Sequence, residues 1–106
     1  TETTAWSLVL AEREAIYIRV EAIVESDSAS RESAGYEVKA AFRRYTGGDV
    51  TQIGATSQPF VVEEDATWNL TIDRDTGTQT VRVRVKGNDA DNTVFLGTVW
   101  YRVLTV

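Results

Sequence analysis

The chain has 106 residues, of which 42% are hydrophobic and 25% charged, and its formal net charge at pH 7 is −5. This length and composition predict one globular domain spanning residues 1–106, with a hydrophobic core of its own. The chain contains no Cys and no His, which excludes Cys/His zinc sites, Ser-His-Asp or Cys-His catalysis, thiol redox chemistry and an imidazole pH switch.

The excess of acidic over basic residues also indicates which binding partners to expect. With 11 Lys and Arg against 16 Asp and Glu, the overall field repels phosphate, so we expect no nucleic-acid partner. No apolar run approaches the roughly 20 residues that a membrane-spanning helix needs, and we expect no membrane association. Residues Thr1–Thr4 show no feature of a secretory signal. The missing Met is what removal of an initiator Met would leave, which favours a complete small protein, although a chosen fragment boundary would look the same.

Alternating hydrophobic and polar residues predict β-strands along most of the chain. The predicted strands are Trp6–Leu10, Ala15–Glu25, Gly35–Tyr45, Val50–Ala55, Pro59–Val62, Thr67–Asp73, Val81–Lys86 and Thr93–Val106. The segment Leu8–Glu14 also admits a short helical turn. Hydrophobic residues occupy both faces of the last strand, so we expect both of its faces to be at least partly covered.

Turn-forming residues separate these segments. The stretch Thr46–Asp49 supplies two glycines for a hairpin, and Asp73–Gly77 supplies the turn before the Val81 strand. Two further polar loops are predicted at Ser26–Ala34 and Gly87–Asn92. Seven or eight short strands separated by such turns predict an all-β fold, an antiparallel β-sandwich or jelly roll.

An acidic cluster precedes Trp68 and consists of Glu63, Glu64 and Asp65. A glycoside hydrolase needs two carboxyl groups across a cleft, and the sequence places no second group opposite this cluster. We therefore interpret the cluster as a solvated loop and expect no catalytic residues. A glycan-active hydrolase that uses these carboxylates is the least favoured alternative.

Two aspartate-rich turns are similar to parts of calcium loops, Asp73-x-Asp75-x-Gly77 and Asp89-x-Asp91. Neither is followed by the Glu that closes an EF-hand loop, and both lie where hairpin turns favour Asp and Asn. We therefore expect no metal and no cofactor.

A basic stripe lies along one strand face and consists of Arg82, Arg84 and Lys86. Such a stripe could bind phosphate or an acidic glycan, and it could lie near Arg43 and Arg44. The favoured interpretation is pairing with carboxylates on neighbouring strands, or exposure that blocks edge pairing. The candidate partners are Glu21, Glu37 and Glu63.

The aromatic residues divide into two groups. Four lie within strand patterns and are expected in the core: Tyr36, Phe42, Trp68 and Trp100. Trp6 and Phe95 are better candidates for a subunit interface or a sugar-stacking surface, and Leu8 joins them as a candidate interface residue. The candidate surface-contact residues lie in the polar loops: Ser28, Arg31, Asn88, Asp89 and Asp91.

Four motifs follow one another between Gly35 and about Trp100. They are Gly35-Tyr36-x-Val38-x-Ala40-x-Phe42-Arg43-Arg44, Thr51-Gln52-Ile53-Gly54-x-Thr56, Glu64-Asp65-x-x-Trp68-x-Leu70 and Val81-Arg82-Val83-x-Val85-x-Gly87. Their order resembles a small β-sandwich module of tailed-phage and prophage virion proteins. The similar modules often carry Thr-x-x-Trp after the last glycine, whereas this chain has Thr93-Val94-Phe95 there and Trp100 later. The final strand is therefore aligned differently.

The resemblance implies a virion structural protein that forms a homotrimer and binds other virion proteins such as the major capsid protein. We expect a capsid decoration or cement protein (a head knob) on the surface of the phage particle, because the chain has no shaft-like segment. The alternative is a receptor-binding or head-binding domain of a tail fibre or spike that contacts a host surface glycan. Trimer formation would cover sheet edges that a small sandwich leaves open.

Overall fold

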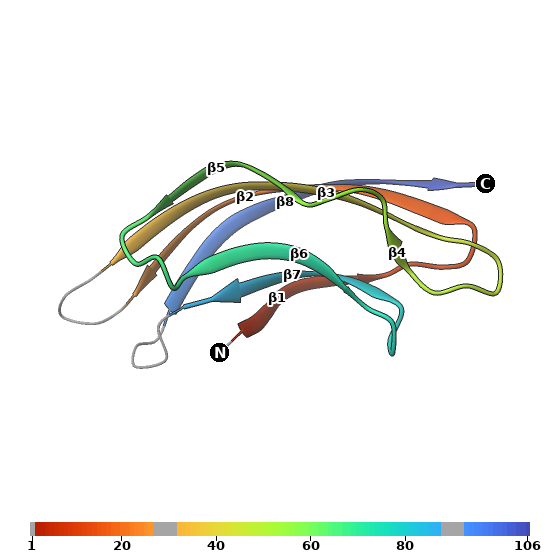
Figure 1. Ribbon diagram of the computed structural model, residues 1–106, viewed down its shortest axis with the longest axis horizontal. Coiled ribbons are helices and arrows are strands. Elements are labelled where there is room, and N and C mark those ends of the chain that lie inside the picture. Colours follow the sequence, from red (N-terminus) through yellow and green to blue (C-terminus); the bar gives the residue numbers. More distant parts are fainter. Residues whose placement is uncertain (1, 27–31, 88–92) are drawn as a thin grey trace.

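A computed structural model describes residues 2–26, 32–87 and 93–106 of the chain (Figure 1). These residues contain no helix, which confirms the predicted all-β fold. They form eight strands: β1 (Glu2–Val9), β2 (Glu14–Ser26), β3 (Ser33–Arg44), β4 (Thr51–Gln52), β5 (Ser57–Glu63), β6 (Asn69–Asp75), β7 (Thr80–Lys86) and β8 (Thr93–Thr105).

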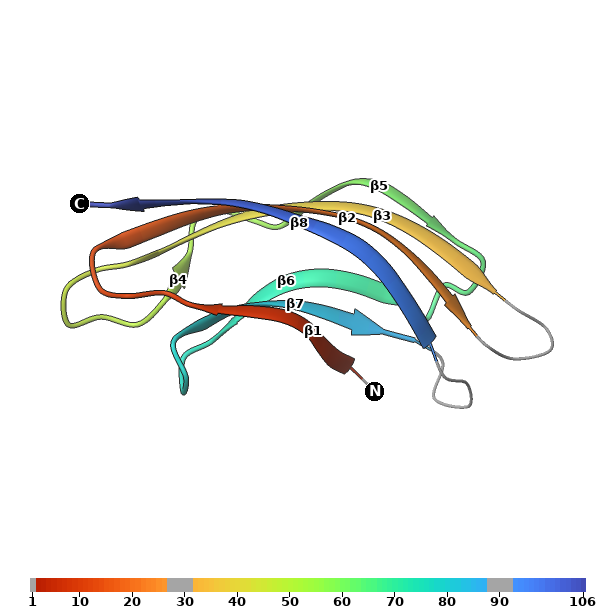
Figure 2. The ribbon, with the colours of Figure 1, turned by 180° about the vertical axis from the view of Figure 1, so that it is seen from behind.

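The strands build two antiparallel sheets that pack as a β-sandwich. The smaller sheet has the order β1-β7-β6, and the larger sheet has the order β4-β3-β2-β8, with β5 also pairing with β3. The larger sheet is bent, and the smaller sheet lies against its concave side (Figures 1 and 2). Both β1 and β8 are edge strands. The molecule is elongated, with extents of 50 × 25 × 19 Å.

The core lies between the two sheets and is filled from alternate positions of the facing strands. The buried hydrophobic residues are Leu10, Ile16, Ile18, Val20, Val24, Ala34, Tyr36, Val38, Ala40, Phe42, Val50, Trp68, Leu70, Ile72, Val81, Val83 and Val85. The assignment of Tyr36, Phe42 and Trp68 to the core is therefore confirmed. The assignment of Trp100 is wrong, because its side chain is 42% exposed on the convex face of the larger sheet.

The other face of the last strand also differs from expectation. Leu96 and Leu104 lie on the same convex face as Trp100 and are 73% and 64% exposed. The sequence correctly indicated hydrophobic residues on both faces of β8. Partial cover of both faces was wrong, because no second layer packs on the convex side among the described elements.

Two connecting segments depart from the prediction because single residues adopt a positive φ. No helical turn forms between Leu8 and Glu14: β1 continues to Val9, and the chain then turns with Arg13 at φ 68° and the Glu14 N–H donating to the carbonyl of Ala11. The strand predicted at Val50–Ala55 is reduced to β4, because Gly54 at φ 71° interrupts the chain between β4 and β5, which both pair with β3.

The basic stripe of β7 pairs across strands as expected, but with other partners. Arg82 contacts Asp73 at 2.9 Å and Asp75 at 3.5 Å, both on β6, and Arg84 lies 3.6 Å from Glu2 on β1. The candidate partners Glu21, Glu37 and Glu63 are wrong because they belong to the larger sheet, as do Arg43 and Arg44. Strand alternation identifies the face of a residue but not the sheet to which its strand belongs.

Candidate functional site

The three candidate interface residues all lie on the two edge strands. Trp6 and Leu8 belong to β1 and Phe95 to β8, and all three are partly buried against the core. The ring of Trp6 lies 5.4 Å from the ring of Tyr101 on β8. Figure 2 shows β1 and β8 along the same side of the sandwich. The structure therefore places the predicted interface residues on one open side of the molecule.

The free edge of β8 presents a regular row of backbone groups. The N–H of Val106 donates to the carbonyl of Arg13 at 2.9 Å, in the same register as the whole β2–β8 ladder. Because hydrogen-bonded pairs alternate in an antiparallel ladder, the even-numbered residues of β8 bond to β2. The odd-numbered residues point their N–H and C=O groups away from β2: Phe95, Gly97, Val99, Tyr101 and Val103. No described strand pairs with this edge.

The side chains of β8 make this edge unusually apolar. Six large hydrophobic residues of the strand are exposed: Val94, Leu96, Trp100, Tyr101, Val103 and Leu104. Arg102 is the only charged residue among the 13 residues of the strand. Natural sheet edges are commonly shortened, charged, interrupted or covered, because an open edge pairs readily with another strand. The edge of β8 therefore has the character of an interaction surface.

A row of hydrophobic side chains continues from β8 across the convex face. Val62, Gly35, Ile23 and Leu96 lie side by side in register on β5, β3, β2 and β8. The ring of Phe60 lies next to Gly35, where an added Cβ would be 3.4 Å from its Cε2 atom. We call Ile23, Phe60, Val62 and Leu96 the outer apolar row. Its four side chains are exposed.

A second region of the convex face carries arginines stacked on aromatic rings. The guanidinium of Arg19 lies 4.4 Å from the ring centroid of Trp100, and that of Arg43 lies 4.5 Å from the ring centroid of Tyr45. The Nε atoms of both arginines are shielded from solvent and have no hydrogen-bond partner. The guanidinium of an arginine stacked on a ring is well suited to bind a carboxylate, sulfate or phosphate through its terminal N–H groups.

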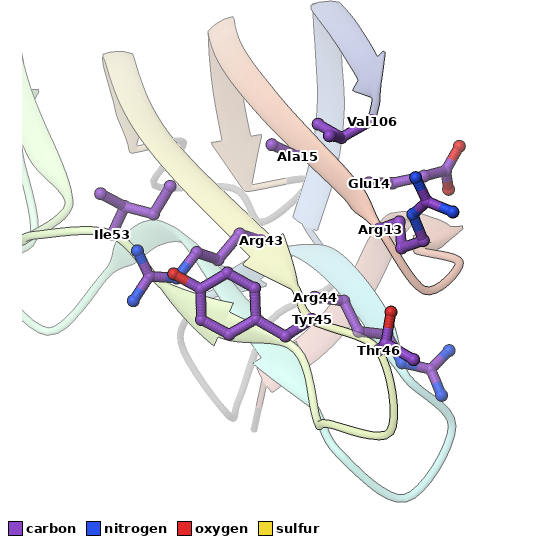
Figure 3. Close-up of a pocket in the computed structure, with 9 residues that line it drawn as sticks. All are labelled: Arg13, Glu14, Ala15, Arg43, Arg44, Tyr45, Thr46, Ile53 and Val106. Carbon is purple, nitrogen blue, oxygen red and sulfur yellow. The ribbon is translucent and has the colours of Figure 1, made fainter.

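Two shallow pockets flank these stacks. Figure 3 shows the first, where Arg43, Tyr45 and Ile53 lie together and face Arg13 and Val106 across a space of about 270 Å³. The second is a hollow of about 390 Å³ beside the Arg19–Trp100 stack. It is lined by Tyr17, Arg19, Trp100, Tyr101 and Arg102. We call these two stacks and their pockets the basic-aromatic face.

The acidic cluster binds groups of its own chain. Glu63 accepts a hydrogen bond from the Tyr36 hydroxyl at 2.9 Å, and Glu64 accepts one from the backbone N–H of Ser33 at 2.8 Å. Asp65 accepts hydrogen bonds from the N–H and hydroxyl of Thr67, which lower the pKa of the Asp65 carboxyl. These bonds fasten the end of β5 and the turn that follows it.

The aspartates of the β6–β7 turn also bind their own chain. Asp73 and Asp75 both contact Arg82, and Asp75 accepts a hydrogen bond from the N–H of Gly77 at 2.9 Å. Within residues 2–26, 32–87 and 93–106, no group of three or more Asp and Glu residues is arranged to hold a metal ion. No helix long and apolar enough to cross a membrane occurs in that part of the chain.

Some candidate residues from the sequence lie outside the described part of the structure, and some surface features of the structure were not predicted. Ser28, Arg31, Asn88, Asp89 and Asp91 lie outside the described residues, as does the Asp89-x-Asp91 turn. The two arginine stacks and the outer apolar row were missed. A usable signal existed for the row, because Ile23 and Leu96 are hydrophobic at positions where the alternation calls for a polar residue.

We compared the chain with protein-family models, with curated proteins and with solved structures. No match was found in any of the three comparisons.

Proposed function

We propose that this protein is a non-enzymatic structural protein of a bacteriophage virion, which assembles with copies of itself and decorates or cements the capsid. The observation that most strongly supports this proposal is the exposed apolar surface formed by the β8 edge and the outer apolar row. The order of sequence motifs between Gly35 and Trp100 supplies the virion context and the expectation of a homotrimer.

The exposed surface favours assembly for a physical reason. Burial of apolar area stabilises an association by about 25 cal/mol per Å² before the entropy of association is subtracted. Soluble monomers rarely expose a large contiguous apolar patch, and such patches mark interaction sites. Here the outer apolar row runs from β5 to Leu96 on the edge strand β8, so the exposed row and the open edge meet at Leu96.

Two measurements test this proposal. Light scattering or native mass spectrometry of the purified chain is expected to show a homo-oligomer at micromolar concentration. Electron cryomicroscopy of the phage particle is expected to show copies of the sandwich on the capsid lattice. A chain that stays monomeric and does not bind capsids lacking it would overturn the proposal.

The basic-aromatic face favours a second candidate, the receptor-binding domain of a tail fibre or spike. Neither Arg19 nor Arg43 forms an ion pair with a carboxylate of the described residues, so positive charge gathers here in a chain of net charge −5. Exposed aromatic rings beside cationic groups could bind a negatively charged surface polysaccharide.

Charge-matched variants separate this candidate from the first. Arg19→Gln and Arg43→Gln remove one stacked cation each, whereas Arg74→Gln removes one exposed cation from the smaller sheet. If the face binds glycan, the first two variants lose binding to a carboxylated polysaccharide and the third retains it. Equal binding by all three variants, or none by the wild type, would dismiss this candidate.

A further inference from the structure

We propose that β8 pairs antiparallel with β8 of a second copy about a two-fold axis at Val99, which joins the two larger sheets into one continuous sheet. This inference rests on the proposed self-assembly and specifies its contact and register, with a two-fold symmetry in place of the three-fold symmetry that the motif resemblance implies. The partner is therefore a second copy of this chain.

The backbone of β8 fits this arrangement over its full length. The outward N–H and C=O groups belong to the odd-numbered residues from Phe95 to Val103. Centring the pair on Val99 places odd-numbered residues opposite odd-numbered residues, so each outward group meets a complementary one. The same register aligns Thr93 with Thr105 of the second copy, so all 13 residues of the strand overlap.

The side chains that meet in this register differ in size. On the inner face Phe95 lies opposite Val103, and Gly97 lies opposite Tyr101. On the convex face the opposed residues are Val94 with Leu104, Leu96 with Arg102, and Thr98 with Trp100. Pairs of an aromatic residue with a smaller or β-branched residue stabilise neighbouring strands, and an aromatic residue opposite a glycine covers exposed backbone.

The charge pattern is compatible with a copy of the same strand. Arg102 is the only charge on β8, and in this register it lies opposite Leu96. The two Arg102 residues are then six positions apart along the ladder, or about 20 Å at the rise of an extended strand. No like charges oppose each other, so the strand meets its own copy without repulsion.

The other edges of the sandwich are less suited to self-pairing. The register of β1 shifts between Thr4 and Trp6, and that of β5 shifts beyond Glu37 of β3, next to Pro59. The edge strand β6 ends in the charged sequence Asp73-Arg74-Asp75. The β8 ladder runs over 13 residues without a register shift, whereas the unshifted ladder of β6 has 7 residues.

The pairing would also place the two smaller sheets on the same side of the joined sheet. Residues directly opposite in an antiparallel pair point to the same face, so both inner faces coincide. The inner-facing side chains of Tyr101 and Val103, which are exposed at the open side of each copy, would then lie against those of the second copy.

A proline substitution at Val99 tests the contact with little effect on the sandwich. The N–H of Val99 points away from β2, so Val99→Pro removes an outward donor and no bond of the β2–β8 ladder. Val99→Ala removes side-chain packing but keeps the N–H. We expect Val99→Pro to weaken association by at least about tenfold and Val99→Ala to retain it, by native mass spectrometry with circular dichroism as the folding check.

A cysteine cross-link tests the register even if Val99→Pro does not fold. The chain has no Cys, so Val99→Cys introduces a single thiol. At the two-fold axis the two Cα atoms are about 5.5 Å apart, within the range of a disulfide. In the matched control Val103→Cys, the two thiols are about 27 Å apart along the ladder. We expect Val99→Cys, and not Val103→Cys, to form a covalent dimer on oxidation.

The outcomes separate this inference from the proposed function. Complexes with an even number of copies and a Val99→Cys cross-link support the pairing. A wild-type trimer without that cross-link overturns the pairing and supports the proposed assembly. A wild-type monomer overturns the pairing, and a monomer that also does not bind capsids lacking it overturns the proposed function as well. Equal cross-linking of the two cysteine variants overturns the register centred on Val99 and with it the proposed contact.

Discussion

The hydroxyl of Tyr36 donates a hydrogen bond to Oε2 of Glu63 at 2.9 Å and thereby joins the core side of β3 to the end of β5. Tyr36 is 3% exposed. Burial, and then the hydrogen bond and negative charge of Glu63, raise the pKa of Tyr36 well above its ordinary value of 10.0. The phenol is therefore held in its neutral form in the folded protein.

This relationship predicts a loss of stability in alkali. The folded pKa of Tyr36 exceeds the unfolded one, so its contribution is fully present below about pH 10 and is lost as the pH rises above that value. We expect the free energy of unfolding to fall as the pH rises above about 10, and to fall less steeply in Tyr36→Phe. At neutral pH that variant is expected to be about 1 kcal/mol less stable.

Urea unfolding at several pH values measures both effects, with exposed Tyr45→Phe as the control. Identical pH slopes for wild type and Tyr36→Phe would contradict the assignment.

The side chain of Gln79 is predicted to be a structural link between two loops, its own β6–β7 turn and the loop that ends at Val50. Its Oε1 accepts a hydrogen bond from the N–H of buried Val50 at 2.9 Å, and its Nε2 donates to Asp49 and to the carbonyl of Thr76. Gln79→Ala leaves the Val50 N–H without this acceptor, so we expect a loss of about 1–3 kcal/mol in the free energy of unfolding. The control is Gln58→Ala, which removes an exposed amide that donates to Asn69 and to the carbonyl of Leu70 but accepts from no buried N–H of the described residues. Similar losses for the two variants would show that the link to Val50 is unimportant.

Gly97 is predicted to be required for close packing on β8. A Cβ atom at this position would lie 2.7 Å from Cζ of Phe95 and 3.0 Å from both Cβ of Ala22 and the carbonyl oxygen of Glu21. Overpacking of this kind costs about 1–3 kcal/mol, so Gly97→Ala should lower the midpoint of urea unfolding. Gly48→Ala places its Cβ no closer than 3.5 Å to other atoms and should change the midpoint little. An unchanged midpoint in Gly97→Ala would mean that the Phe95 ring moves aside freely.

The ion pair on the smaller sheet should contribute modestly and depend on salt. Asp73 accepts two hydrogen bonds from Arg82, at 2.9 and 3.0 Å, and both side chains are partly exposed. Asp73→Asn is expected to cost about 0.5–1 kcal/mol in low salt and less in high salt, because solvent and ions screen the charges. Thermal unfolding at two salt concentrations measures the difference. A cost that does not change with salt would indicate lost hydrogen bonding rather than charge attraction.

The sequence by itself determined the strands and much of the core. The two-residue alternation of β2, β3 and β7 specifies which side chains point inward, and Phe42, Tyr36 and Trp68 lie where it indicated. Turn residues correctly separated the strands, since Gly and Asp favour turns through local backbone preferences. These features depend on neighbours along the chain, which is why the sequence alone was sufficient.

Only the tertiary structure decided which strands share a sheet and which surfaces stay open. The partners of Arg82 and the exposure of Trp100 depend on strand order, which pairs residues far apart in the sequence. Alternation places Trp100 and Tyr101 on opposite faces of β8, but it does not reveal that neither face is fully covered. That outcome follows from the position of β8 at the edge of the larger sheet. The open strand on which the proposed assembly depends is therefore a property of the fold.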